Sequence, residues 1–180
     1  VTNSSVTLAQ QKALSDSIQA QLEEAYNHIS PLHNPRTAYA KIQDAERLSK
    51  KTKDSVDLLR IYRTKALLCH FNSDLENCKK NVSRIKSLLQ YCNDPLEIAN
   101  TYELLFQLQP LPSEKGKDYL LKAYDLFTEY GKPENKIDIN YNLALLYNRS
   151  KEWNKAVKHA QLGIDAIESS QQKTGMRKYL

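Results

Sequence analysis

Catalysis needs side chains that converge on one substrate, and this sequence offers few such groups. It contains no G-x-S-x-G or H-E-x-x-H motif, which would indicate a hydrolase nucleophile or a metalloprotease. Glu23 and Glu24 are adjacent in a helical pattern and point in different directions, which does not suit an acid–base pair. The four glycines never come closer than twelve residues, so a phosphate-binding loop is absent. We therefore predict a protein that is not an enzyme.

The cysteines and histidines do not form a metal-binding pattern. There is no C-x-x-C motif, and the four histidines do not lie at helical ligand spacing with the three cysteines. We expect no metal and no cofactor. We interpret Cys69, Cys78 and Cys92 as buried thiols. Because Cys69 and Cys78 flank one predicted turn, a disulfide between them stays open as an alternative in an oxidising compartment.

Basic residues are concentrated in one segment of a chain whose net charge is +5. Residues 47–86 contain eleven Lys and Arg against four Asp and Glu. Such a segment attracts nucleic acid or another acidic surface, or it is simply a solvated helical face. Only Tyr62 and Phe71 are interleaved with the charges, which counts against stacking on single strands. We expect no nucleic-acid partner and keep electrostatic binding through residues 47–86 as the alternative function.

The elements that position these residues are predicted to be helices throughout. Apolar residues recur at helical spacing, as at Ala38, Ile42, Ala45 and Leu48, and no strand-like alternation is convincing. No apolar run approaches the roughly 18–20 residues that cross a bilayer. The sequence therefore predicts an all-α fold without membrane contact in this segment.

The helical pattern repeats about every forty residues. Small residues at Ala38, Cys78, Gly116 and Ala156 are spaced by 40, 38 and 40 residues, and each precedes the same pattern of packing residues. Small residues let two helices approach closely, and counting back twelve gives partners such as Ala66 for Cys78 and Leu104 for Gly116. We predict hairpins at residues 5–51, 55–92, 95–130 and 135–170, with a further helix beginning at 174–180.

The fourth hairpin resembles the tetratricopeptide repeat (TPR). It contains Leu143-Ala144-x2-Tyr147, followed by Trp153-x2-Ala156-x3-Ala160-x2-Gly163. The resemblance covers residues 19–170 and is strongest at 137–168, although Asn140 replaces the usual Trp and Ala160 replaces a large aromatic residue. It implies one domain over residues 1–180, a right-handed α-solenoid of about four antiparallel helix hairpins that ends at the start of a fifth.

The resemblance also implies a binding groove lined by the first helix of each hairpin. Two guanidinium groups would hold a carboxylate or phosphate, and Tyr141 with its apolar neighbours would cover apolar side chains. As alternatives, Arg60 and Arg63 form salt bridges with Asp57 or Glu103, and Leu105 is buried against a neighbouring helix. The predicted groove residues are Arg60, Arg63, Leu67, His70, Leu105, Tyr141, Leu145, Asn148 and Arg149.

Repeats of nearly forty residues are similar to those in the sensor regions of bacterial signalling proteins, such as receptor-type diguanylate cyclases and kinases. This similarity implies a module that binds a protein or peptide ligand with an acidic group, acting as sensor or scaffold of a larger protein. We expect an extracytoplasmic (periplasmic) segment of a membrane-anchored protein, or otherwise a cytoplasmic one. A third hypothesis is a structural assembly subunit with an oligomer interface at residues 98–108.

Overall fold

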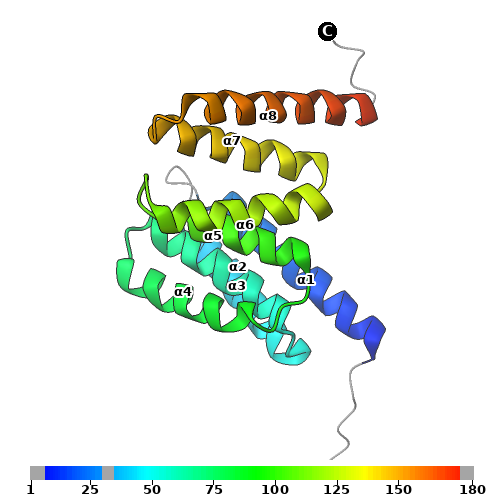
Figure 1. Cartoon of the computed structure of the whole chain (residues 1–180). Helices are drawn as coiled ribbons and strands as arrows, with labels where there is room; N and C mark the ends of the chain where they lie inside the picture. Colours follow the sequence, from blue (N-terminus) through cyan, green and yellow to red (C-terminus); the bar gives the residue numbers. More distant parts are fainter. Residues whose placement is uncertain (1–6, 30–34, 175–180) are drawn as a thin grey trace, which may run out of the picture. The chain divides into compact units, whose positions relative to one another are not determined.

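The computed structural model of the chain describes residues 7–29 and 35–174, the last four of them by backbone alone. Within these residues the chain forms eight α-helices and no strand (Figure 1), which confirms the predicted all-α fold. The contacts divide the chain into two compact units, residues 1–92 and 93–180. The single domain over residues 1–180 stays a prediction. Of the further helix predicted at 174–180, all residues after Thr174 lie outside the part of the chain that the structure describes.

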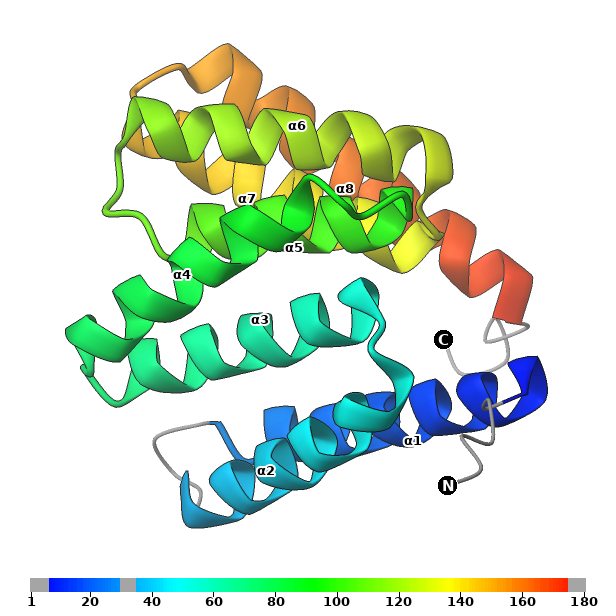
Figure 2. The same ribbon diagram turned by 90° about the horizontal axis from the view of Figure 1, so that it is seen from below.

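The first unit contains the helices α1 (Leu8–Asn27), α2 (Pro35–Thr52), α3 (Ser55–Phe71) and α4 (Leu75–Leu89). α1 packs on α2, and α3 packs on α4 (Figure 2). α3 also packs on both α1 and α2, so the third helix joins the two pairs. The helices present buried stripes at helical spacing, including Ile18, Leu22 and Ala25 on α1 and Ala38, Ile42 and Ala45 on α2.

Polar residues start the helices of this unit because the first backbone N–H groups of a helix have no partner within it. Thr7 accepts the N–H of Gln10, whose side chain accepts the N–H of Thr7 in return. Asp54 accepts the N–H of Val56 at 2.7 Å and so caps α3. The turns before α3 and α4 contain the positive-φ residues Lys53 and Ser73, so the chain reverses there within a few residues.

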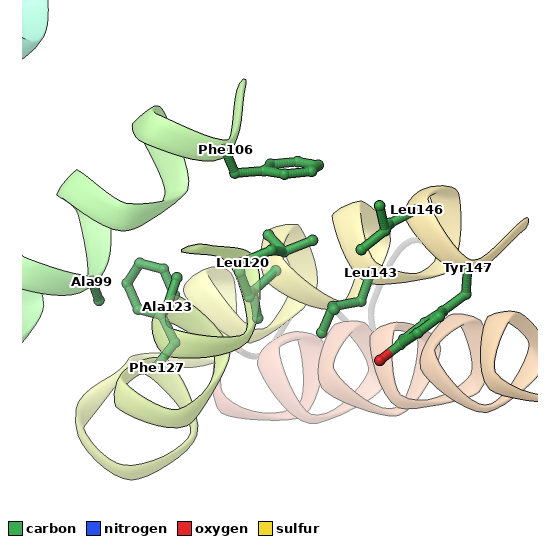
Figure 3. Packing of buried hydrophobic residues seen from close by; sticks show 9 residues of the cluster. Ala99, Phe106, Leu120, Ala123, Phe127, Leu143, Leu146 and Tyr147 are labelled. Atoms are coloured by element: carbon green, nitrogen blue, oxygen red, sulfur yellow. The ribbon is translucent and has the colours of Figure 1, made fainter. Parts of the chain in front are cut away.

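The second unit contains α5 (Pro95–Gln107), α6 (Glu114–Tyr130), α7 (Pro133–Arg149) and α8 (Trp153–Thr174). α5 packs on α6, α6 on α7, and α7 on α8. One hydrophobic core joins these helices, and Figure 3 shows most of its side chains gathered together. This core consists of Ala99, Phe106, Leu120, Ala123, Phe127, Ile139, Leu143, Leu146 and Tyr147.

Three of the small residues that marked the predicted repeat are packed against other parts of the chain, and the fourth, Ala156, is partly buried. Ala38 and Gly116 are buried, and the Sγ atom of Cys78 lies 3.7 Å from the carbonyl oxygen of Ala66, the residue reached by counting back twelve. At Gly116, counting back twelve residues does not reach the nearest neighbour in the structure. A side chain there would first meet Gln109 and Phe106, at 3.4 and 3.5 Å, rather than Leu104. The turn between α5 and α6 is longer than those between α3 and α4 and between α7 and α8, which shifts the pairing.

Candidate functional site

A polar pocket of about 430 Å³ opens in the first unit. α1 and α3 are in contact, and each is the first helix of a helix pair. These are helices of the kind that the resemblance to the tetratricopeptide repeat led us to expect at a binding groove. Its lining consists of Leu8, Gln11, Lys12, Ser15 and Asp16 from α1, Thr52 and Asp54 near the α2–α3 turn, and Asp57 and Arg60 from α3.

Asp57 is the buried member of this pocket, with 0% of its surface exposed. Its Oδ1 atom accepts a hydrogen bond from the Ser15 hydroxyl at 2.7 Å and lies 3.7 Å from Nη1 of Arg60. Its Oδ2 atom is also buried and has no hydrogen-bond partner among the described residues. A buried carboxylate oxygen is costly without a donor. This oxygen therefore lies beneath the surface of the pocket without a donor among the described residues.

The other charged residues of the pocket are accessible. Lys12 and Asp16 are exposed on α1, and Asp54 is exposed while it caps α3. Together with Asp57 and Arg60 they give three carboxylates and two cations. No group of three or more His, Cys, Asp or Glu in the described part of the chain is placed to hold a metal ion. The arrangement suits recognition of a polar segment that carries both signs of charge.

The residues predicted on α3 differ in how much surface they offer. Arg60 is partly exposed and forms the ion pair with Asp57 that we had stated as the alternative. Arg63 is also partly exposed, whereas Leu67 is buried. His70 is exposed near the end of the helix, where its ring lies edge-on to Phe71 at 6.0 Å. The α3 face therefore contributes charged groups more than apolar ones.

In the second unit, four of the predicted residues lie on α7. Tyr141 is 67% exposed, Leu145 is partly exposed, and Asn148 and Arg149 are exposed. Tyr141, Leu145 and Asn148 are spaced by four and three residues, so they share one face of the helix. Leu105 of α5 is 1% exposed, which agrees with the alternative of burial. Apart from the buried Leu105, the predicted residues form one set on α3 and one on α7, in separate units.

Several of the basic residues at 47–86 are paired with acidic residues. Lys65 Nζ lies 2.8 Å from a carboxylate oxygen of Glu46, and Lys80 Nζ lies 2.6 Å from Glu76. Arg47 pairs with Asp44 at 3.0 Å. These pairs lower the positive electrostatic potential with which the segment would attract an acidic partner. Its remaining exposed cations include Lys50, Lys51, Lys53, Lys79, Arg84 and Lys86.

A polar contact between α7 and α8 was not predicted from the sequence. Nδ1 of His159 lies 2.8 Å from Oδ1 of the buried Asn140, whose amide nitrogen donates to the carbonyl of Lys136. The His159 ring also stacks on Tyr147 at 5.5 Å. Burial, followed by the charge of Lys158, lowers the pKa of His159. The sequence did contain one sign of this contact, because Asn140 is polar at a position where the tetratricopeptide repeat usually has Trp.

The cysteines are free thiols in the structure. Burial raises the pKa of Cys69, and the nearby Asp74 raises it further. The pKa of Cys78 is raised by the same two causes in the same order. Because the thiolate is the nucleophile, these two thiols are poorly suited to covalent chemistry.

Comparison with known proteins gives no relative for this chain. No family model, curated protein or solved structure matches it. In the region that most resembles the tetratricopeptide repeat, Leu143 and Tyr147 belong to the buried core, and Ala156 is partly buried against that core. Among the described helices, none combines the length and the hydrophobicity needed to cross a membrane.

Proposed function

We propose that this chain is a non-catalytic TPR-like module that binds a protein or peptide. The support from the fold is the packing order of its helices. In the first unit, α1 packs on its partner α2 and also on α3, the first helix of the next pair. A helical-repeat solenoid places first helices side by side in this way. This support comes from the first unit, since the contacts of the second unit run from α5 to α6, α7 and α8 in turn.

The polar pocket between α1 and α3 carries the proposal. Its exposed groups, Lys12 and Asp16, lie beside the ion pair of Asp57 and Arg60. A peptide carries charged groups of both signs on its side chains, so it can pair with both exposed groups. Because Nη1 of Arg60 lies 3.7 Å from Oδ1 of Asp57, the carboxylate partly offsets the positive charge of Arg60. We therefore propose a peptide segment with basic and acidic groups, in place of one recognised by its acidic group alone.

The exposed face of α7 is a second contact surface in this proposal. Tyr141 combines a large apolar ring with a hydroxyl group, and aromatic residues of this kind contribute strongly at protein interfaces. Leu145 lies one turn further along, and Arg149 one turn beyond it. This surface suits the apolar side chains of a ligand, as the sequence led us to expect. The role as sensor or scaffold of a larger bacterial signalling protein is part of the same proposal.

A random-peptide display screen against the whole chain tests this function. The affinities of enriched peptides for wild type are then compared with those for Lys12→Gln/Asp16→Asn, which changes exposed pocket residues, and for Tyr141→Ala. Lys50→Gln/Asp125→Asn changes exposed residues outside both surfaces and is the matched control. We expect the pocket variant or Tyr141→Ala to weaken binding at least about tenfold, or ~1.4 kcal/mol, with the control unchanged.

Two results would overturn the proposal. One is a screen that enriches no peptide beyond those recovered with an unrelated protein. The other is a set of enriched peptides that bind both variants and the control as well as wild type. Circular dichroism of each variant shows whether the helices are retained, so that a loss of binding is not confused with a loss of folding.

A further inference from the structure

Two opposite charges flank the exposed apolar residues of α7. Asp138 and Arg149 are both exposed, and within the described part of the chain neither side chain forms a hydrogen bond or an ion pair. Between them lie Tyr141, which is 67% exposed, and Leu145, which is partly exposed. Because these residues are spaced by three, four and four positions, they share one side of the helix. We call these four residues the polarised α7 face.

Other sides of α7 hold this helix in its unit. Nδ1 of His159 on α8 lies 2.8 Å from Oδ1 of Asn140, and the side chain of Asn142 donates a hydrogen bond to Glu103 of α5 at 2.8 Å. The residues of α7 that enter the hydrophobic core are Ile139, Leu143, Leu146 and Tyr147, of which Figure 3 shows the last three. The polarised α7 face is therefore additional to the packing that builds the second unit.

The charges at the two ends of this face have opposite signs. Desolvation raises the pKa of Asp138, and no cation among the described residues acts in the opposite direction, as one would in an ion pair. Glu134, one turn before Asp138, adds a second carboxylate at that end. The exposed Lys151 follows Arg149 at the other end. The face is therefore acidic toward the start of α7 and basic toward its end.

The distance between the two charged positions limits the kind of ligand that can pair with both. Asp138 and Arg149 are eleven residues apart in the chain, which corresponds to about 16 Å along the helix axis. An extended peptide rises about 3.3 Å per residue, so a basic and an acidic side chain about five residues apart span this distance. A helical ligand would need about eleven residues, and isolated helices of this length are marginal in water. An extended segment is therefore the simpler match.

The middle of the face suits the apolar part of such a segment. Side chains on one side of an extended chain recur every two residues, or about 7 Å, and Tyr141 and Leu145 lie about 6 Å apart along α7. We propose that the polarised α7 face binds an extended peptide whose basic side chain pairs with Asp138, whose acidic side chain pairs with Arg149, and whose apolar side chains cover the residues between them. This inference rests on the proposed function and adds the order of the charges along the binding surface.

Double-mutant cycles with peptides from the display screen test this order of charges. The peptides used are those whose affinity falls in Tyr141→Ala, because this loss places them on the polarised α7 face. In each peptide the basic or the acidic residue is replaced by Gln, and binding to wild type, Asp138→Asn and Arg149→Gln is measured by fluorescence anisotropy. We expect each single change to weaken binding about twofold to fivefold, the range of an exposed ion pair. The basic residue should couple to Asp138 and the acidic residue to Arg149.

Asp125→Asn and Lys115→Gln are the matched controls at exposed positions of α6, and both should act additively with every peptide change. Additive effects at Asp138 and Arg149, or coupling in the crossed order, would overturn this inference and leave the proposed function standing. The same holds if the peptides that need Tyr141 lack charged residues, or if no enriched peptide needs Tyr141. An empty screen would instead reject the proposed function, and this inference with it. Circular dichroism confirms that each variant remains folded.

Discussion

The imidazole of His159 lies against the buried amide of Asn140, with Nδ1 of the first 2.8 Å from Oδ1 of the second. The amide nitrogen of Asn140 already donates to the carbonyl of Lys136. The oxygen must therefore accept, and Nδ1 of His159 must carry a hydrogen. This bond links α7 to α8 and fixes the tautomer of the neutral ring.

The stability of the chain is expected to depend on pH through this histidine. Burial lowers the pKa of His159 in the folded state, so the unfolded chain binds the proton more readily. The contribution is favourable above the unfolded histidine pKa of about 6.5 and is lost as the pH falls through the interval just below it. Urea denaturation between about pH 7.5 and 5.5 should show a smaller decline in stability for His159→Gln than for wild type.

His70→Gln is the control for this experiment, since it makes the same chemical change at an exposed histidine. Equal slopes for wild type and His159→Gln would show that His159 is as readily protonated in the folded chain as in the unfolded one. That result would contradict the effect assigned to its burial.

The all-α fold and the packing of neighbouring helices could be predicted because both depend on short-range spacing. Cys78 meets Ala66 as predicted since the turn between them is tight. The partner of Gly116 was predicted wrongly because a longer turn separates α5 from α6. Leu105 posed another difficulty: it lies between Leu104 and Phe106, and all three are buried, so periodicity could not assign a face to it.

The pocket was less predictable because its central bond joins residues 42 positions apart. Asp57 was considered only as a salt-bridge partner of the arginines, and local spacing gives no reason to place Ser15 beside it. A weak signal did exist. Ser15 lies one turn before Ile18 on the stripe that continues through Leu22 and Ala25, all three of them buried. A polar residue at such a position requires a buried partner.

The hydrogen bond between Ser15 and Asp57 predicts a coupled loss of stability. Ser15→Ala removes a donor from a carboxylate that is fully buried, so we expect it to lower the free energy of unfolding by about 1–3 kcal/mol. In an Asp57→Ala background the same substitution should cost much less, because no carboxylate is left to satisfy. A double-mutant cycle in urea measures this difference.

Ser17→Ala is the control for that cycle, since Ser17 is exposed on the same helix and its hydroxyl donates to the carbonyl of Ala13. Its effect should be small and the same in both backgrounds. Additive effects of Ser15→Ala and Asp57→Ala would mean that the two side chains do not share a hydrogen bond, and the described pocket geometry would then be incorrect.

The core of the second unit predicts a strong difference between two aromatic residues of α6. Phe127 is fully buried among Leu120, Ala123 and residues of the other helices, so Phe127→Ala should lower the free energy of unfolding by about 3–5 kcal/mol. Tyr130, nearly one turn later, is about half exposed, and Tyr130→Ala should cost much less. Chemical denaturation followed by circular dichroism gives both values, and similar losses for the two variants would argue against this core.

Replacing Ser73 by glycine should stabilise the first unit. Ser73 has a φ of 58° in the turn between α3 and α4. A left-handed conformation costs a non-glycine residue about 1–2 kcal/mol, whereas glycine loses roughly 0.5–1 kcal/mol through its greater freedom when unfolded. The backbone bond from the Ser73 N–H to the carbonyl of His70 is retained. We therefore expect a net gain of about 0.5–1 kcal/mol.

Ser83→Gly makes the same chemical change inside α4, where Ser83 is exposed. Glycine is a poorer helix former than serine by about 0.5 kcal/mol, so this variant should lose stability. Opposite signs for the two substitutions in urea denaturation would support the left-handed turn. A loss in Ser73→Gly comparable to that in Ser83→Gly would contradict it, because the penalty for a side chain at φ 58° would then be absent.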